Sequence, residues 1–85
     1  MNRPTTILIA DDDADLRDIL RSVLEPAGFA VVEAADGEAA QQAIRRRTPD
    51  LVILDYMMPG LTGPQVCQWL KQDTLLRHTP VIMLT

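Results

Sequence analysis

The chain has 85 residues, a formal net charge of −4 and a single cysteine, Cys67. This length allows one domain, the acidic balance disfavours binding of nucleic acids or anionic membranes, and a lone cysteine excludes an intrachain disulfide and a cysteine-based zinc site. No apolar run reaches the roughly 18–20 residues of a membrane span. The N-terminal residues do not form a secretory signal, so we predict a cytoplasmic location.

Short apolar runs predict four β-strands. The first, residues 6–10 (T-I-L-I-A), is continuously apolar and β-branched, which is typical of a strand buried in a parallel sheet. Similar runs follow at residues 30–34, 51–54 and 81–84. The third run leads directly into Asp55.

Apolar residues at helical spacing predict one helix between each pair of consecutive strands. The first helix follows three aspartates and ends before Pro26. Its apolar side comprises Leu16, Ile19, Leu20, Val23 and Leu24, and its polar side comprises Arg17, Asp18 and Arg21. The second helix opens at Asp36, and the third begins after Thr62 with a proline at an early position.

The resulting order βαβαβαβ predicts an α/β fold with a parallel sheet. Right-handed crossovers in a doubly wound sheet give the strand order 2-1-3-4, in which the first and third strands are neighbours. Ligands of such sheets bind outside the carboxyl ends of the strands, where the direction of winding reverses.

Four aspartates lie at these strand ends. Asp11, Asp12 and Asp13 follow the first strand, and Asp55 follows the third. We therefore expect Asp11, Asp12 and Asp55 to converge, whereas Asp13 or Asp15 is expected to cap the first helix. Clustered carboxylates repel one another unless a cation intervenes, and ligands that are all oxygen favour Mg²⁺ or Mn²⁺ over Zn²⁺. A carboxylate beside such a metal is placed to attack phosphorus and form an acyl phosphate.

Two other aspartate motifs do not fit. The spacing of Asp11, Asp13 and Asp15 matches the start of an EF-hand loop, but Leu16 replaces its glycine and Ser22 its final glutamate. The haloacid-dehalogenase phosphatases also begin with aspartates after a strand, but their downstream elements are missing from this sequence.

Three segments together resemble the receiver domain of two-component response regulators: I-L-I-A-D-D-D, P-D-L-V-I-L-D-Y-M-M-P-G-L-T-G and T-P-V-I-M-L-T. The resemblance implies a flavodoxin-like fold. It also implies that Asp55 is the phosphoacceptor, that Asp12 binds Mg²⁺ directly and that Asp11 is its acidic partner. The backbone carbonyl of Met57 would complete the protein's share of the coordination. Thr85 would be the switch hydroxyl that moves toward the phosphoryl group.

The resemblance has one gap. Receiver domains continue past this threonine into a helix, a fifth strand with a functional lysine and a final helix. The one lysine of this chain, Lys71, is predicted to be a solvated charge on the third helix. We therefore expect residues 1–85 to form a single partial receiver domain without the fifth strand and the last two helices.

Three functions follow as hypotheses. The first is a phosphoacceptor domain, not a turnover enzyme, which receives a phosphoryl group from a sensor histidine kinase or a phosphotransfer protein. The second is an interaction or oligomerisation fragment that cannot be phosphorylated, and the third is a small metal-dependent phosphatase. We also expect self-association, most simply as a homodimer, because residues 81–84 form an uncharged apolar strand at the predicted sheet edge.

Overall fold

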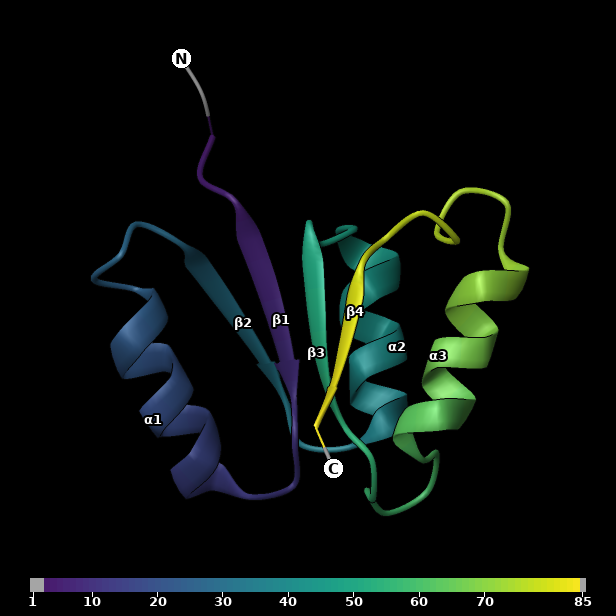
Figure 1. The fold of residues 1–85 in the computed structure, drawn as a ribbon. Helices are drawn as coiled ribbons and strands as arrows, with labels where there is room; N and C mark the ends of the chain where they lie inside the picture. Colours follow the sequence, from purple (N-terminus) through teal and green to yellow (C-terminus); the bar gives the residue numbers. More distant parts are fainter. Residues whose placement is uncertain (1–2, 85) are drawn as a thin grey trace.

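The computed structural model describes residues 3–84 and contains one parallel sheet with helices on both faces (Figure 1). Its four strands are β1 (Thr6–Ala10), β2 (Ala30–Ala34), β3 (Leu51–Asp55) and β4 (Val81–Leu84). Their order is β2-β1-β3-β4, which confirms the predicted topology. The third strand is one residue longer than predicted and includes Asp55.

Three helices connect the strands: α1 (Ala14–Leu24), α2 (Gly37–Arg46) and α3 (Gly63–Gln72). Helix α1 covers one face of the sheet, and helices α2 and α3 cover the other (Figure 1). Among residues 3–84, no helix is long and apolar enough to span a membrane.

Side-chain caps set where each helix begins. The Asp13 carboxylate accepts hydrogen bonds from the backbone N–H groups of Asp15 (2.9 Å) and Leu16 (3.3 Å), so Asp13 caps α1 as expected. Asp36 caps α2 in the same way. Thr62 and Gln65 form a reciprocal capping box at the start of α3.

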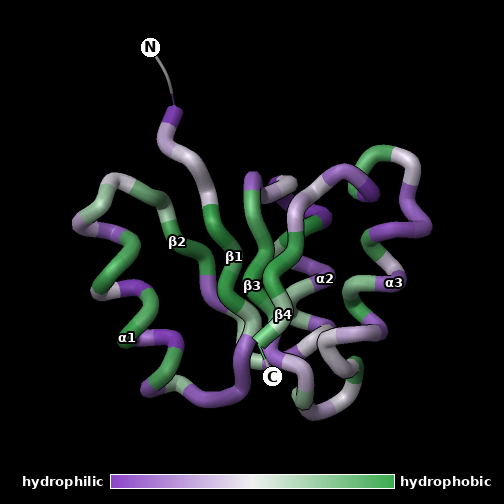
Figure 2. Tube along the Cα trace, viewed as in Figure 1, coloured by the Kyte–Doolittle hydropathy of each residue, from purple (hydrophilic) through white to green (hydrophobic). Residues whose placement is uncertain are grey.

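The apolar core has two parts, one on each face of the sheet. Strand β1 is buried along its whole length and contributes to both parts. Figure 2 shows the contrast between these hydrophobic central strands and the hydrophilic segment that follows β1. The larger part, under α2 and α3, contains Leu8, Ile44, Leu54 and Leu70.

The predicted apolar side of α1 is correct only in part. Leu20 and Leu24 pack against the sheet, but Ile19 and Val23 are 58% and 65% exposed. Arg17, predicted on the polar side, is instead half-buried against β2 because it forms an ion pair with Glu33. The helix is therefore rotated toward this charged residue of the edge strand.

Candidate metal centre

Three carboxylates converge where β1 and β3 end. Asp11 and Asp12 follow β1, and Asp55 is the last residue of β3. Because Ala10 lies beside Leu54 in the parallel register, Asp11 and Asp55 lie at the same level of the sheet. One carboxylate oxygen from each of Asp11, Asp12 and Asp55 lies within 4.8 Å of the others. The structure thus brings together the three residues that the strand order predicted.

Asp11 is the buried member of this cluster, with 3% of its surface exposed. Its Oδ1 accepts a hydrogen bond from the N–H of Asp13 at 2.8 Å. Its pKa is raised above the ordinary value by burial and, less strongly, by the negative charges of Asp55 and Asp12. A cation beside the carboxylate would offset both effects.

The backbone of Asp11 is held from two sides. Its N–H donates to the carbonyl of Ala34 on β2 at 3.0 Å. Its carbonyl accepts from Nη1 of Arg17 at 2.6 Å. Sequence reasoning assigned Arg17 only to the polar side of a helix and did not connect it with the site.

Asp12 is exposed, and Asp55 is half-buried at the end of its strand. The position of Asp55 is set by the neighbouring backbone: Tyr56 N–H donates to the Leu84 carbonyl on β4 at 2.8 Å, and Gly63 N–H donates to the Tyr56 carbonyl at 3.0 Å. Oδ1 of Asp55 also accepts a long hydrogen bond from Met57 N–H at 3.4 Å. The Asp55 carboxylate is therefore accessible while its backbone is anchored.

Gly63 lies so close to Asp55 that a side chain could not be accommodated. A Cβ at this position would lie 2.2 Å from the Asp55 carbonyl oxygen and 2.8 Å from Sδ of Met83. In the sequence, Gly63 is the last residue of the segment P-D-L-V-I-L-D-Y-M-M-P-G-L-T-G, just before the proline of the third helix. Nothing in the local pattern indicated its contact with the site.

Among residues 3–84, no cationic side chain forms an ion pair with these three carboxylates. Within residues 3–84, the ion pairs involve only Arg17, Arg21, Glu25 and Glu33. Hard oxygen ligands with uncompensated charge fit a divalent cation such as Mg²⁺ or Mn²⁺. The donor set and its spacing are thus suited to the predicted metal.

Two other predicted residues stand apart from this cluster. Thr85, the predicted switch hydroxyl, lies outside the described residues. Lys71 is an exposed charge on α3, as predicted. Its Nζ donates to the carbonyls of Arg77 (3.1 Å) and Thr79 (3.0 Å), so it ties the end of α3 to the loop before β4.

Comparison with known proteins establishes the family. The sequence model of the response regulator receiver domain matches residues 7–85. This chain is a receiver domain. Receiver domains are signalling domains of two-component response regulators, and as a class they bind Mg²⁺ through acidic residues and interact with histidine kinases or phosphotransfer proteins.

Relatives of this receiver domain include transcriptional regulators. The phosphate regulon transcriptional regulatory protein PhoB of Pseudomonas aeruginosa is 44% identical over 80 residues, which are 94% of this chain and 35% of PhoB. The DNA-binding response regulator MtrA of Mycolicibacterium paratuberculosis is 44% identical over 79 residues, which are 93% of this chain and 34% of MtrA. The chain thus spans about a third of the length of these curated relatives.

Solved structures share the fold. The N-terminal domain of a response regulator receiver protein from Methanoculleus marisnigri has a TM-score of 0.90 and 38% identity, over 94% of this chain and 65% of that one. The chemotaxis response regulator CheY4 of Vibrio cholerae has a TM-score of 0.91 and 28% identity, over 95% and 68%. The receiver domain described here therefore has the flavodoxin-like arrangement that the sequence predicted.

Proposed function

We propose that this receiver domain accepts a phosphoryl group on Asp55 from a phosphohistidine of a sensor histidine kinase or a phosphotransfer protein. Asp11, Asp12, Asp55 and the backbone carbonyl of Met57 would hold the Mg²⁺ or Mn²⁺ ion. The observation that carries the proposal is the convergence of three carboxylates without an internal cation at the carboxyl edge of the sheet.

Accessibility of the carboxylate and anchoring of the backbone, taken together, favour Asp55 as the nucleophile. Asp11 is buried and already accepts a hydrogen bond, whereas Asp12 lies in the exposed loop after β1. Asp55 combines an accessible carboxylate with a backbone anchored to β4 and α3. Such an anchored nucleophile can be held in line with an incoming phosphoryl group, and positioning is most of what phosphoryl transfer requires from a protein.

The transfer itself needs no further reactant. An oxygen of Asp55 forms a bond to phosphorus while the phosphorus–nitrogen bond of the phosphohistidine breaks. The electron pair of that bond remains on the imidazole. The products are an acyl phosphate on Asp55 and the unphosphorylated histidine side chain of the partner protein. A divalent cation, when bound, supplies charge stabilisation for the phosphoryl oxygens. Asp11 and Asp12 would hold that cation.

Phosphorylation with a small-molecule phosphodonor tests this proposal. With Mg²⁺, we expect the wild-type chain to gain an acid-stable, base-labile label and Asp55→Asn to gain none. Asp12→Asn should require a higher Mg²⁺ concentration to reach the same extent of phosphorylation, because it loses a charged ligand. Asp15→Asn is the matched control, since Asp15 is an exposed aspartate at the start of α1 outside the cluster.

Two results would contradict the proposal. Label that persists in Asp55→Asn would place the phosphoacceptor elsewhere. Equal Mg²⁺ dependence in wild type, Asp12→Asn and Asp15→Asn would reject the metal site. Release of phosphate from unrelated phosphate esters would instead favour a metal-dependent phosphatase.

We also propose that the 85-residue chain forms a homodimer through β4. Within residues 3–84, β4 pairs only with β3, and its other edge has no strand partner there. The strand carries no charge, and Ile82 is 49% exposed. An uncharged apolar edge is a template for pairing with a second strand. An interaction fragment that cannot be phosphorylated would use the same edge.

A further inference from the structure

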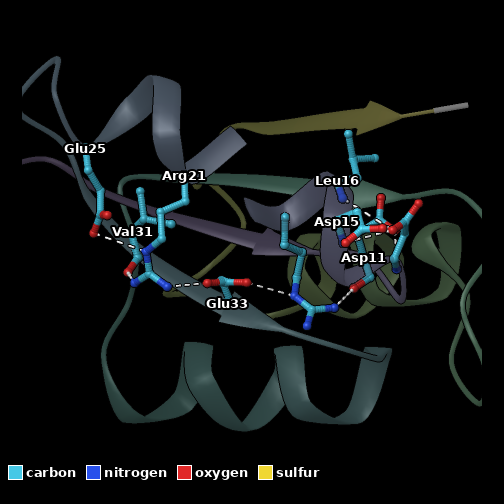
Figure 3. Close-up of polar contacts among 9 residues, drawn as sticks. Asp11, Asp15, Leu16, Arg21, Glu25, Val31 and Glu33 are labelled. Carbon is cyan, nitrogen blue, oxygen red and sulfur yellow. Dashed lines mark hydrogen bonds and ion pairs between the residues drawn. The ribbon is translucent and has the colours of Figure 1, made fainter. Parts of the chain in front are cut away.

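Two arginines of α1, one turn apart, pair with the same glutamate on β2. Nε of Arg17 lies 2.9 Å from Oε1 of Glu33, and Nη1 of Arg21 contacts Oε2 of the same carboxylate. Figure 3 shows Glu33 between Arg21 and the Asp11 end of the site, with an interaction on each side. The two arginines therefore have a shared partner.

Only one of the two arginines reaches the acidic site. Nη1 of Arg17 donates to the Asp11 carbonyl at 2.6 Å. Arg21 donates instead to the Val31 carbonyl at 3.1 Å and pairs with Glu25 at 3.1 Å, away from the carboxylates. Arg17 thus connects the ion pairs between α1 and β2 to the backbone of a predicted metal ligand.

The planar guanidinium suits this connection. Arg17 uses Nε for Glu33 and Nη1 for the Asp11 carbonyl, so one rigid group joins two acceptors. Its side chain is only 16% exposed, and hydrogen bonds from a charged donor in such a position are short and strong. Together with the bond from Asp11 N–H to Ala34, it ties both sides of the Asp11 backbone to β2.

We infer that Arg17 is a positioning residue for the acidic site: through the Asp11 carbonyl, it holds the start of the loop after β1 so that Asp11 and Asp12 face Asp55. This inference rests on the proposed function. Repulsion among three close carboxylates pushes the loop away from Asp55, and the anchored Asp11 backbone opposes that movement. Residues that orient ligands in this way change metal affinity without touching the metal.

The direction in which metal affinity changes when Arg17 is removed distinguishes a positioning role from a purely electrostatic one. The guanidinium is a cation near the site, so its charge alone repels a metal ion, and its removal would tighten binding. Loss of an anchor instead weakens binding, because the ligands are then no longer held in place. We therefore expect removal of Arg17 to weaken binding despite the removal of positive charge.

Titration with Mn²⁺ followed by electron paramagnetic resonance, and with Mg²⁺ by calorimetry, tests the inference. We expect Arg17→Gln to raise the Kd by about tenfold, the lower end for residues that orient metal ligands. Arg17→Lys keeps the charge but cannot serve both acceptors in the same geometry, so its Kd should also rise. Arg21→Gln is the matched control: it also loses an ion pair with Glu33 but does not contact Asp11, so its Kd should change by less than about twofold.

A second readout reports on the anchor itself. The carbonyl ¹³C chemical shift of Asp11 in the metal-free chain should move in Arg17→Gln and stay unchanged in Arg21→Gln, because only Arg17 donates to that carbonyl. Thermal unfolding of both variants shows whether their losses of stability are comparable. A purely structural role of Arg17 would change stability and leave the metal affinity unchanged.

The possible failures are distinguishable. If the wild-type chain binds neither Mg²⁺ nor Mn²⁺, the proposed function is rejected. If the wild type binds and Arg17→Gln binds equally or more tightly, the inference about Arg17 is rejected and the proposed function stands. If Arg17→Gln does not fold, Arg17→Lys decides, and wild-type affinity in that variant would reject the inference.

Discussion

Replacing Gly63 with alanine would insert a methyl group between α3 and the end of β3. The new Cβ would lie 2.2 Å from the Asp55 carbonyl oxygen and 2.8 Å from Sδ of Met83. The methionine side chain can rotate away, but the carbonyl belongs to the backbone of a strand paired on both sides. Relief of the clash therefore requires helix and strand to separate by about 0.8 Å, a typical source of overpacking strain.

The expected loss of stability follows from two opposing terms. Overpacking costs up to about 3 kcal/mol when the contacted atom is rigid. Alanine gains at most about 1 kcal/mol over glycine from its helix propensity. The net loss is about 2 kcal/mol, and since each kcal/mol lowers the Tm of a domain of this size by about 4–8 °C, the Tm should fall by about 8–16 °C.

Gly37→Ala is the matched control for this prediction. Gly37 is also the first residue of its helix, and a Cβ there would lie 2.4 Å from the Leu61 carbonyl oxygen, away from the Asp55 backbone. Thermal unfolding followed by circular dichroism should show a lower Tm in both variants. Phosphorylation of Asp55 at saturating Mg²⁺ should slow in Gly63→Ala alone, because only that clash displaces Asp55.

Two results would refute the reasoning. A Tm of Gly63→Ala within about 2 °C of wild type would show that the backbone relaxes at almost no cost, in conflict with the steric argument. Equal slowing of phosphorylation in Gly37→Ala would show that the effect does not pass through the Asp55 carbonyl.

Three further predictions concern the pH dependence of stability, a loop anchor and the sheet edge. The pKa of Asp11 is raised above 3.8 in the folded state, so this carboxyl binds more protons in the folded than in the unfolded chain, and its contribution to the stability of the metal-free chain falls as pH rises above 3.8. Asp11→Asn should lack this component and resist urea better than wild type near neutral pH, and identical pH profiles would contradict this. Lys71→Met should lower the free energy of unfolding by about 1 kcal/mol, because two loop carbonyls lose their charged donor; an unchanged Tm would show that the two hydrogen bonds contribute nothing. In light scattering across a dilution series, Ile82→Lys should dissociate dimers of the 85-residue chain, while Val32→Lys on the opposite edge strand should not; a wild-type chain that stays monomeric at high concentration would reject the dimer.

The sequence by itself determined the elements and their order, because their signals are local. β-branched apolar runs predict buried strands, and side-chain caps such as Asp13 and Thr62 mark where helices begin. The meeting of Asp11 with Asp55 was also predictable, since handedness makes β1 and β3 neighbours and parallel strands end at the same edge.

Only the tertiary structure decided which side chains meet across long separations in the chain. Arg17 and Glu33 are 16 residues apart, and their contact depends on how far α1 is rotated over the edge strand. The same rotation leaves Ile19 exposed, although helical spacing placed it with the core residues. Gly63 meets the Asp55 carbonyl only because α3 begins against the end of β3. Periodicity specifies which side of a helix is apolar, but not how the helix sits on its sheet. That orientation is set by the sum of ion pairs, packing and loop geometry in the folded chain.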